Sequence, residues 1–233
     1  MKFITALIME TKTYILKCPH CGTEKKVTFS AHLLPDSSYI YWSDGRVECD
    51  GWKETIRTHQ CPSCRKFYAF SSATNLREDN EPCDDNGQLP YETLKLAIAE
   101  LSGDDYAESW ARLEAWRAYN TLYRDTDAPT DAQAFNHSNM VWLKDHFTAS
   151  TPWFSLLVFE LNRLLGNKET CRQMLEDFTF EAFMAKTEAR DSEKGIHRTR
   201  DLDTMRARYT EQKPDLEYAL TLPLKPYIEN DIK

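Results

Sequence analysis

The spacing of hydrophobic and polar positions changes once along the chain, near residue 90. Before that point, short runs of alternating apolar and polar residues are separated by glycine, proline, asparagine and aspartate, which is typical of short β-strands. Residues 26–30 alternate in this way, residues 39–42 and 46–49 flank a Ser-Asp-Gly turn as a hairpin, and residues 65–70 predict a further strand. The first part of the chain is therefore predicted to be rich in β-structure.

After residue 90 the apolar residues recur at the three- and four-residue spacing of amphipathic α-helices. Pro90 favours a helix start, and Gly103 and Gly166 stand where apolar stripes end. Residues 218–222 indicate a short strand or an extended tail. Helices are predicted over residues 91–101, 106–123, 131–147, 152–165 and 168–190, with a weaker helix over 199–211.

Together these patterns predict an α+β protein in which a small β-rich domain, residues 1–75, precedes a mainly α-helical domain, residues 91–213. Residues 76–90 are poor in apolar side chains and dense in turn-forming residues, so they are predicted to be an acidic linker. Their carboxylates lack the spacing of a calcium-binding loop and indicate a solvated segment. Residues 214–233 are expected to form an extended carboxyl-terminal tail.

The chain has 233 residues, a formal net charge of −8 and only seven glycines. The glycines match neither the Walker nor the dinucleotide-binding spacing, which argues against those classes of nucleotide-binding enzyme. No apolar stretch approaches the roughly 20 residues that cross a bilayer, and residues 1–9 lack the apolar core and cleavage site of a secretory signal. We therefore expect a cytoplasmic protein without a membrane segment.

Four of the seven cysteines form two C-P-x-C motifs, which pair Cys18 with Cys21 and Cys61 with Cys64. Two residues between the thiolates let both sulfurs face one ion from a tight turn, and proline favours that turn. A redox motif usually occurs once, at a strand-to-helix junction, and neither pair lies in such a context. We therefore predict that these four cysteines bind one structural zinc ion, and a thiol-disulfide protein remains an alternative.

The segment between the two motifs, residues 22–60, is longer than the usual ribbon spacing of about 15 to 20 residues, so the zinc ribbon is predicted to be elaborated. Cys49, His20, His32 and His59 are alternative ligands, and they are less favoured because the paired motifs already supply four. Four thiolates leave no coordination position for water, and the chain lacks the His-x-Glu motif of zinc deaminases. The metal is therefore predicted to be structural rather than catalytic.

In these features the chain resembles an uncharacterised bacterial family in which a zinc ribbon with two C-P-x-C motifs precedes tetratricopeptide-like helices. The resemblance rests on the four motif cysteines, the aromatic strand at residues 66–70 and the helix at residues 116–123, and it covers about residues 14–190. The helices around Leu165 and Gly166 resemble the second half of a tetratricopeptide unit. The resemblance implies a structural zinc ion and repeat-like helices, and it implies no activity.

Charge is divided unevenly, because residues 1–75 hold ten basic and seven acidic residues while the remainder carries a formal charge of −11. A second basic group at residues 197–208 also contains acidic residues and indicates a solvated helix face. Binding of single-stranded nucleic acid by charge and stacking is therefore an alternative function, although packing in the ribbon core is the simpler interpretation of its aromatic residues. The residues concerned are Lys25, Lys26, Arg57, Arg65 and Lys66, with Tyr41, Trp42, Phe67 and Tyr68.

No catalytic residue is predicted, since the chain lacks the His-Glu-x-x-His and Gly-x-Ser-x-Gly motifs and its six histidines are scattered. The expected function is that of a non-enzymatic zinc-binding adaptor whose helical domain binds a protein partner. Trp110 and Trp116 are candidates for lining a peptide groove, although core packing is the commoner role at helical spacing. The alternative is a nucleic-acid-binding zinc ribbon whose helical domain dimerises.

Overall fold

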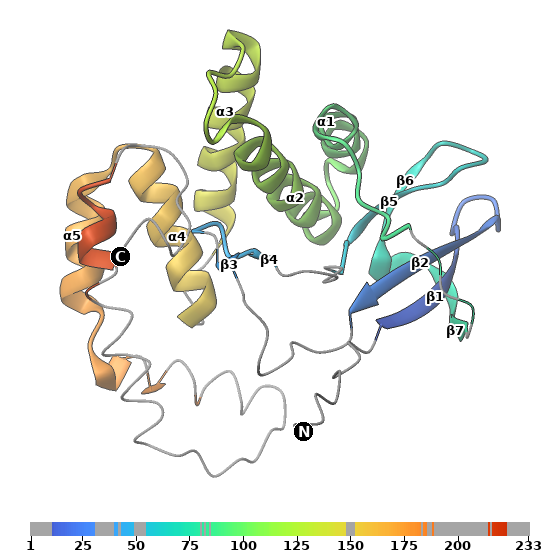
Figure 1. Cartoon of the computed structure of the whole chain (residues 1–233), viewed down its shortest axis with the longest axis horizontal. Coiled ribbons are helices and arrows are strands. Elements are labelled where there is room, and N and C mark those ends of the chain that lie inside the picture. The colour runs from blue at the N-terminus through green and yellow to red at the C-terminus, as the bar shows by residue number, and fades with distance from the viewer. Residues whose placement is uncertain are drawn as a thin grey trace, which may run out of the picture. The chain divides into compact units, whose positions relative to one another are not determined.

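The fold is known from a computed structural model that describes residues 11–30, 40–41, 43–48, 55–79, 81, 83, 85–147, 152–182, 184–185, 188, 214 and 216–222. The chain divides into two compact units. Unit 1 comprises Met1–Ile40 and Val47–Thr121, and unit 2 comprises Tyr41–Arg46 and Leu122–Lys233. A small antiparallel sheet with a cysteine cluster near the amino terminus precedes mostly helices, as the sequence predicts (Figure 1).

Unit 1 is built on an antiparallel sheet with the strand order β2-β1-β7 (Figure 1). Strand β1, Thr11–Lys17, pairs with β2, Glu24–Ser30, along its whole length, and β2 includes the strand predicted over residues 26–30. Strand β7, Thr74–Asp79, pairs with the other edge of β1. The buried core of this sheet consists of Leu16, Val27 and Phe29, which lie against Tyr14, Phe70 and Ala73.

Strand β7 was not predicted, and its last four residues are the first four of the expected linker. Its sequence is polar because β7 is an edge strand whose side chains make ion pairs across the sheet. Glu78 accepts from Lys12 at 2.9 Å, and Arg77 donates to Glu24 at 3.0 Å. Unit 1 continues through residues 76–90 as far as Thr121; the domain limits expected from the sequence stay a prediction.

Two shorter strand pairs complete the β-structure of the described residues. Strand β5, Thr58–Gln60, pairs with β6, Phe67–Ala69, which lies inside the strand predicted over 65–70, and a 3-10 turn, η1, follows over Phe70–Ser72. Strands β3, Ile40–Tyr41, and β4, Val47–Glu48, form the hairpin predicted around the Ser-Asp-Gly turn.

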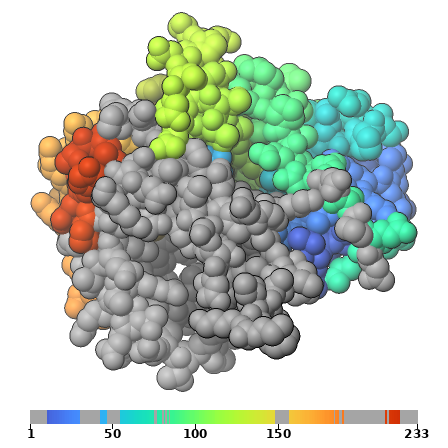
Figure 2. All heavy atoms as spheres, viewed as in Figure 1, coloured from blue at the N-terminus to red at the C-terminus, as the bar shows by residue number. Residues whose placement is uncertain are grey.

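Helices α1, Tyr91–Leu101, and α2, Asp105–Tyr123, confirm the first two predicted helices. Helix α1 contacts strand β6, and Figure 2 shows its side chains, in green, beside those of the strands, in cyan and blue. Two helical carboxylates accept hydrogen bonds from the backbone of β6 and of the residue before β5. The N–H of Phe67 donates to Glu100 at 3.2 Å, and the N–H of Arg57 donates to Glu114 at 2.6 Å.

Unit 2 contains helices α3, Thr130–His146, α4, Pro152–Leu164, and α5, Lys168–Asp177, with α4 packed against both α3 and α5 (Figure 1). Gly166 ends α4 as predicted, because its φ of 78° lets it and Asn167 donate backward to Arg163 and Asn162 in a Schellman motif. The tetratricopeptide-like character expected for these helices is not confirmed.

The helix predicted over residues 168–190 is interrupted after α5. Phe178 and Thr179 leave helical geometry, and the Thr179 side chain accepts a hydrogen bond from the N–H of Ala182 at 3.2 Å, as the first residue of a new helix does. Residues 216–219 are helical rather than extended. Ala219 is buried against Phe159 and Cys171, so an apolar face at helical spacing explains the difference from the expected tail.

Unit 2 also buries charge. Arg163 donates to both carboxylate oxygens of Glu160 at 2.7 and 2.8 Å, and both side chains are almost fully buried. Burial raises the pKa of Glu160, and Arg163 opposes that rise. Asp44 and Arg46, from the turn between β3 and β4, form a second buried ion pair at 3.1 Å. Replacing one residue of either pair would leave the charge of the other buried and uncompensated, which would destabilise unit 2.

In the part of the chain that the structure describes, no helix combines the length and the apolar character needed to cross a bilayer.

We predict that Glu114 makes stability depend on pH. Burial raises the pKa of its carboxyl from 4.5 to about 7, against the hydrogen bonds from Arg57 and Thr58. Between these two pKa values the folded chain keeps a proton on the Glu114 carboxyl that the unfolded chain has lost. The stabilisation from this protonation is therefore complete at low pH and is lost as the pH rises from 4.5 to about 7. The slope is at most about 1.4 kcal/mol per pH unit.

Glu114→Gln keeps the acceptor and removes the titration. We compare the free energies of unfolding of the variant and the wild type in urea at about pH 5 and about pH 7.5. The difference, variant minus wild type, should be on the order of 2 kcal/mol larger at the higher pH. The exposed Glu92→Gln on α1 should show no such gain. An equal difference between Glu114→Gln and wild type at both pH values would contradict the prediction.

Candidate metal centre

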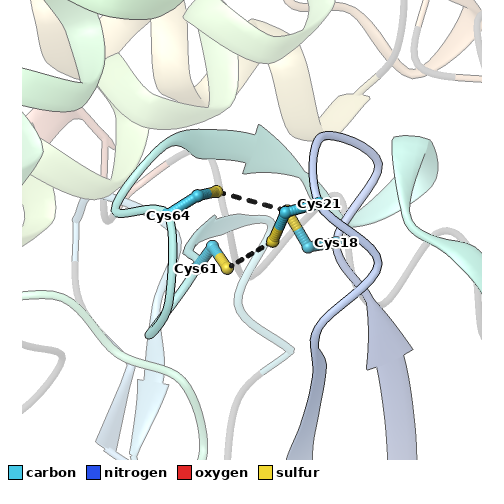
Figure 3. Close-up of side chains that lie close together, drawn as sticks. All are labelled: Cys18, Cys21, Cys61 and Cys64. Atoms are coloured by element: carbon cyan, nitrogen blue, oxygen red, sulfur yellow. Dashed lines mark hydrogen bonds between the residues drawn. The ribbon is translucent and has the colours of Figure 1, made fainter.

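The four motif cysteines, Cys18, Cys21, Cys61 and Cys64, come together in unit 1 although 39 residues separate the two pairs (Figure 3). Their sulfur atoms all lie within 4.8 Å of one another. The Sγ atoms of Cys21 and Cys61 are 3.5 Å apart, and those of Cys18 and Cys64 are 3.8 Å apart. The arrangement is consistent with a metal site formed by four sulfur ligands.

Each pair of cysteines lies in the turn of a β-hairpin. The first motif joins β1 to β2, and the second joins β5 to β6. Cys18 donates its N–H to Thr23 O at 2.9 Å, and Cys61 donates to Lys66 O at the same distance and the same offset along the chain. The hairpin strands therefore help to fix the position of both turns and of the cysteines that they carry.

The two turns also share a left-handed residue directly after the second cysteine. Gly22 has φ 77° and donates to Cys18 O at 3.0 Å, while Arg65 has φ 62° and donates to Cys61 O at 3.1 Å. Glycine adopts this conformation without strain, whereas a residue with a Cβ atom is strained there by about 1 kcal/mol. Arg65 is the one non-glycine residue with positive φ among those described.

The pKa values of two of the clustered thiols are shifted in opposite directions. Hydrogen bonds with the side chain and the backbone of Thr23 lower the pKa of the exposed Cys21 to about 6. Although the Lys66 backbone opposes the change, burial and the neighbouring cysteines raise the pKa of Cys64 to about 12. Burial and then the four nearby thiols also raise the pKa of Tyr68. Four thiolates at this spacing repel one another unless a cation compensates their charge.

Of the alternative ligands, the two that the structure describes are not part of this cluster. His20 lies 3.2 Å through Nε2 from the carbonyl oxygen of Phe67, and His59 is fully buried between the rings of Tyr68 and Phe70. Burial, followed by the charge of Lys25, lowers the pKa of His59 to about 3, so this imidazole is neutral. Cys49 and His32 lie outside the described residues.

The remaining polar candidates of the expected linker make local contacts. The Cys83 sulfur lies 3.3 Å from the hydroxyl of Thr28. The acidic residues pair with strand lysines, Asp79 and Glu81 with Lys26 and Asp85 with Lys25, rather than gathering around a common point. Asp84 lies outside the described residues. These ion pairs account for the described carboxylates of Asp79, Glu81 and Asp85, and the solvated acidic linker stays a prediction.

Of the aromatic residues proposed to stack on nucleic acid, the two whose side chains the structure describes are buried. Phe67 and Tyr68 are buried, with 4% and 2% of their surface exposed, so they belong to the core of the ribbon. Trp116 is also fully buried and does not line a groove, while Trp110 is half-buried beneath the guanidinium of Arg57. The Tyr41 side chain, Trp42 and the basic group at residues 197–208 lie outside what the structure describes.

Two carboxylates that bind the backbone on either side of the second motif, Glu100 and Glu114, were not predicted from the sequence. A signal for Glu114 was present, since it follows Ala107 and Ala111 at helical spacing on an otherwise apolar face. A charged residue in such a stripe indicates a buried polar contact.

We predict that Arg65→Gly stabilises the chain, because glycine relieves the strain of the left-handed turn. The free energy of unfolding should rise by about 1 kcal/mol, measured by thermal or urea unfolding of the metal-loaded protein. Lys66→Gly, at the next position and without positive φ, should lower it by roughly 0.5–1 kcal/mol. If Arg65→Gly unfolds more easily than the wild type, strain at this position is not the dominant effect.

In comparisons with known proteins, no family model, no curated protein sequence and no solved structure matches the chain.

Proposed function

We propose that the protein is a non-enzymatic, cytoplasmic zinc-binding adaptor, in which a structural zinc ribbon is joined to helices that bind another protein. The observation that carries the proposal is the cluster of Cys18, Cys21, Cys61 and Cys64. A tetrahedron of sulfurs around zinc, with Zn–S bonds of about 2.3 Å, has edges of about 3.8 Å. The two sulfur pairs at 3.5 and 3.8 Å are close to that length.

Zinc rather than a redox-active or oxygen-preferring metal suits this donor set, because four thiolates are soft ligands and zinc accepts a tetrahedron of them. With all four positions taken by protein, no position is available for water or substrate, so the ion has a structural role. It would join the β1-β2 turn to the β5-β6 turn. The stabilisation from such an ion is on the order of 10 kcal/mol gross.

Cys18→Ser and Cys61→Ser test the zinc assignment. Each variant should lose its zinc, measured as metal per chain after gel filtration, because a tetrahedral site with three thiolates binds zinc more weakly. Amide hydrogen exchange in β5 and β6 should accelerate strongly, while α4 and α5 stay protected as in the wild type.

Cys83→Ser is the matched control, since this thiol contacts Thr28 and lies outside the cluster. It should keep one zinc per chain and the wild-type pattern of exchange. A Cys61→Ser protein that still holds one zinc and melts like the wild type would exclude the four-sulfur site.

The adaptor role is supported by apolar side chains that the described fold leaves exposed on its helices. Leu96 on α1 is 64% exposed, and Tyr106 at the start of α2 is 51% exposed. Large exposed apolar and aromatic side chains contribute strongly to protein interfaces. The tetratricopeptide-like arrangement belongs to the same proposal, and the packed α4-α5 pair is the feature that supports it.

We expect affinity capture with the zinc-loaded chain to retain a defined protein partner. The double variant Leu96→Glu/Tyr106→Glu should keep its zinc and its circular dichroism but lose that partner, because a charge on an apolar contact leaves it unpaired. Lys12→Glu, on the central strand β1 of the sheet, should retain the partner. Identical captured proteins for the wild type and the double variant would contradict the role of these helices.

A further inference from the structure

A cavity of about 440 Å³ lies beside the second cysteine motif in unit 1. Three segments that are distant in the sequence form its wall. They are the start of β2 with Lys25 and Lys26, the end of β5 and the following turn with Gln60 and Arg65, and the connector to α1 with Asp85. Its volume falls in the range of small-ligand sites.

Basic side chains dominate the polar lining. The sequence predicted a possible basic surface from residues scattered between positions 25 and 66, and the fold brings Lys25, Lys26 and Arg65 to one cavity. Lys66 is not part of the lining. Three of the predicted basic residues therefore lie close enough together to contact one ligand.

Arg65 occupies its place in the cavity despite backbone strain. The equivalent position of the first motif is Gly22, which has the same hydrogen bond and the same left-handed conformation. Gln60 donates through its side-chain amide to the carbonyl oxygen of Arg65 at 3.0 Å and holds this turn in position. A residue kept in a strained conformation where glycine suffices indicates a role for its side chain.

The opposite wall of the cavity is fixed by backbone contacts. Thr28 donates its N–H to Asp85 O at 2.9 Å, and Gly87 donates to the Asp85 carboxylate at 2.6 Å. Gly87 has φ 81°, and a Cβ atom there would lie within 3 Å of the His59 ring. The connector is thus held closely against the buried histidine, so the cavity is preformed.

The three basic side chains of the cavity are matched in number by three carboxylates. Asp85 lies 3.3 Å from Lys25, and Asp79 and Glu81 lie 2.7 and 3.0 Å from Lys26. No ion pair involves Arg65 in the part of the chain that the structure describes. The lysines are therefore oriented by carboxylates, and the guanidinium of Arg65 is the cation of the cavity that is not engaged by a carboxylate.

We propose that this cavity binds a phosphate group, with Arg65 as the principal contact and Lys25 and Lys26 as supporting donors. Arginine presents a planar set of donors that matches two phosphate oxygens, and an ammonium group matches a third. Phe67 and Tyr68 do not stack on a base, because both are buried in the core. The site is independent of the adaptor function, since it needs no protein partner.

The phosphate can come from two sources, a small phosphorylated molecule or the phosphodiester backbone of a single-stranded nucleic acid. Amide shifts of the zinc-loaded, isotope-labelled full chain are followed during titration with inorganic phosphate, at constant ionic strength maintained with chloride. Residues of the β5-β6 turn should shift and saturate at millimolar phosphate or below. Parallel titrations with ribose 5-phosphate and with a short single-stranded RNA show which of the two sources of phosphate binds more tightly.

Arg65→Gly separates this role from a structural one. It should keep its zinc and melt at a higher temperature than the wild type while its affinity for phosphate falls at least tenfold. Arg77→Gln removes the same charge from β7, outside the cavity, and should bind phosphate as the wild type does.

Three results would overturn the proposal. The first is an absence of shifts in the wild type up to tens of millimolar phosphate. The second is equal phosphate affinity of Arg65→Gly and wild type. The third is loss of zinc from Arg65→Gly, which would mean that the arginine compensates the charge of the thiolates instead of binding a ligand.

Discussion

Four sulfur atoms that converge on one point impose the main geometric constraint on unit 1. Cys18 and Cys21 belong to the turn of one hairpin, and Cys61 and Cys64 to the turn of a second hairpin in a different sheet. A metal ion bound by all four would couple the two sheets at their turns. A ribbon of this size buries little apolar surface, so such an ion would take the place of a larger core.

The second hairpin is also held by the helices that follow it. Glu100 and Glu114 accept backbone N–H groups from β6 and from the residue before β5, so the strands on both sides of the Cys61 turn carry a contact with a helix. Helix α1 and most of α2 therefore belong with the ribbon, in one compact unit. A metal bound by the four cysteines would stabilise the same hairpin that these helices contact.

The sequence carried a clear signal for the cysteine site and for most elements, and the reasons are physical. Paired C-P-x-C motifs have few other uses. Helix α1 follows Pro90 and ends before Gly103, and α4 begins at Pro152 and ends before Gly166. The break after α5 was missed because Thr179 caps a new helix without interrupting the apolar pattern.

Strand β7 and the contacts of Glu100 and Glu114 were missed for another reason. An edge strand with ion-paired side chains has the composition of a loop. The contact of Glu100, an exposed residue on α1, leaves no motif, and the place of Glu114 in an apolar stripe indicates a buried contact without naming its partner. The cavity beside Arg65 could not be predicted from the sequence, because its wall combines three distant segments whose meeting depends on the fold. The sequence indicated which basic residues were candidates, but not which of them lie together in the fold.

The pairing of the β2-β1-β7 sheet limits how another polypeptide can attach to unit 1. On one side, the backbone of Thr28 in β2 is already bonded to the connector at Asp85. On the other side, β7 presents Arg77, Glu78 and Asp79, and charged residues at an open edge discourage the addition of a foreign strand. Strand addition, a common mode of peptide recognition, is therefore disfavoured at this sheet, and self-association into extended β-structure is opposed by the same edges.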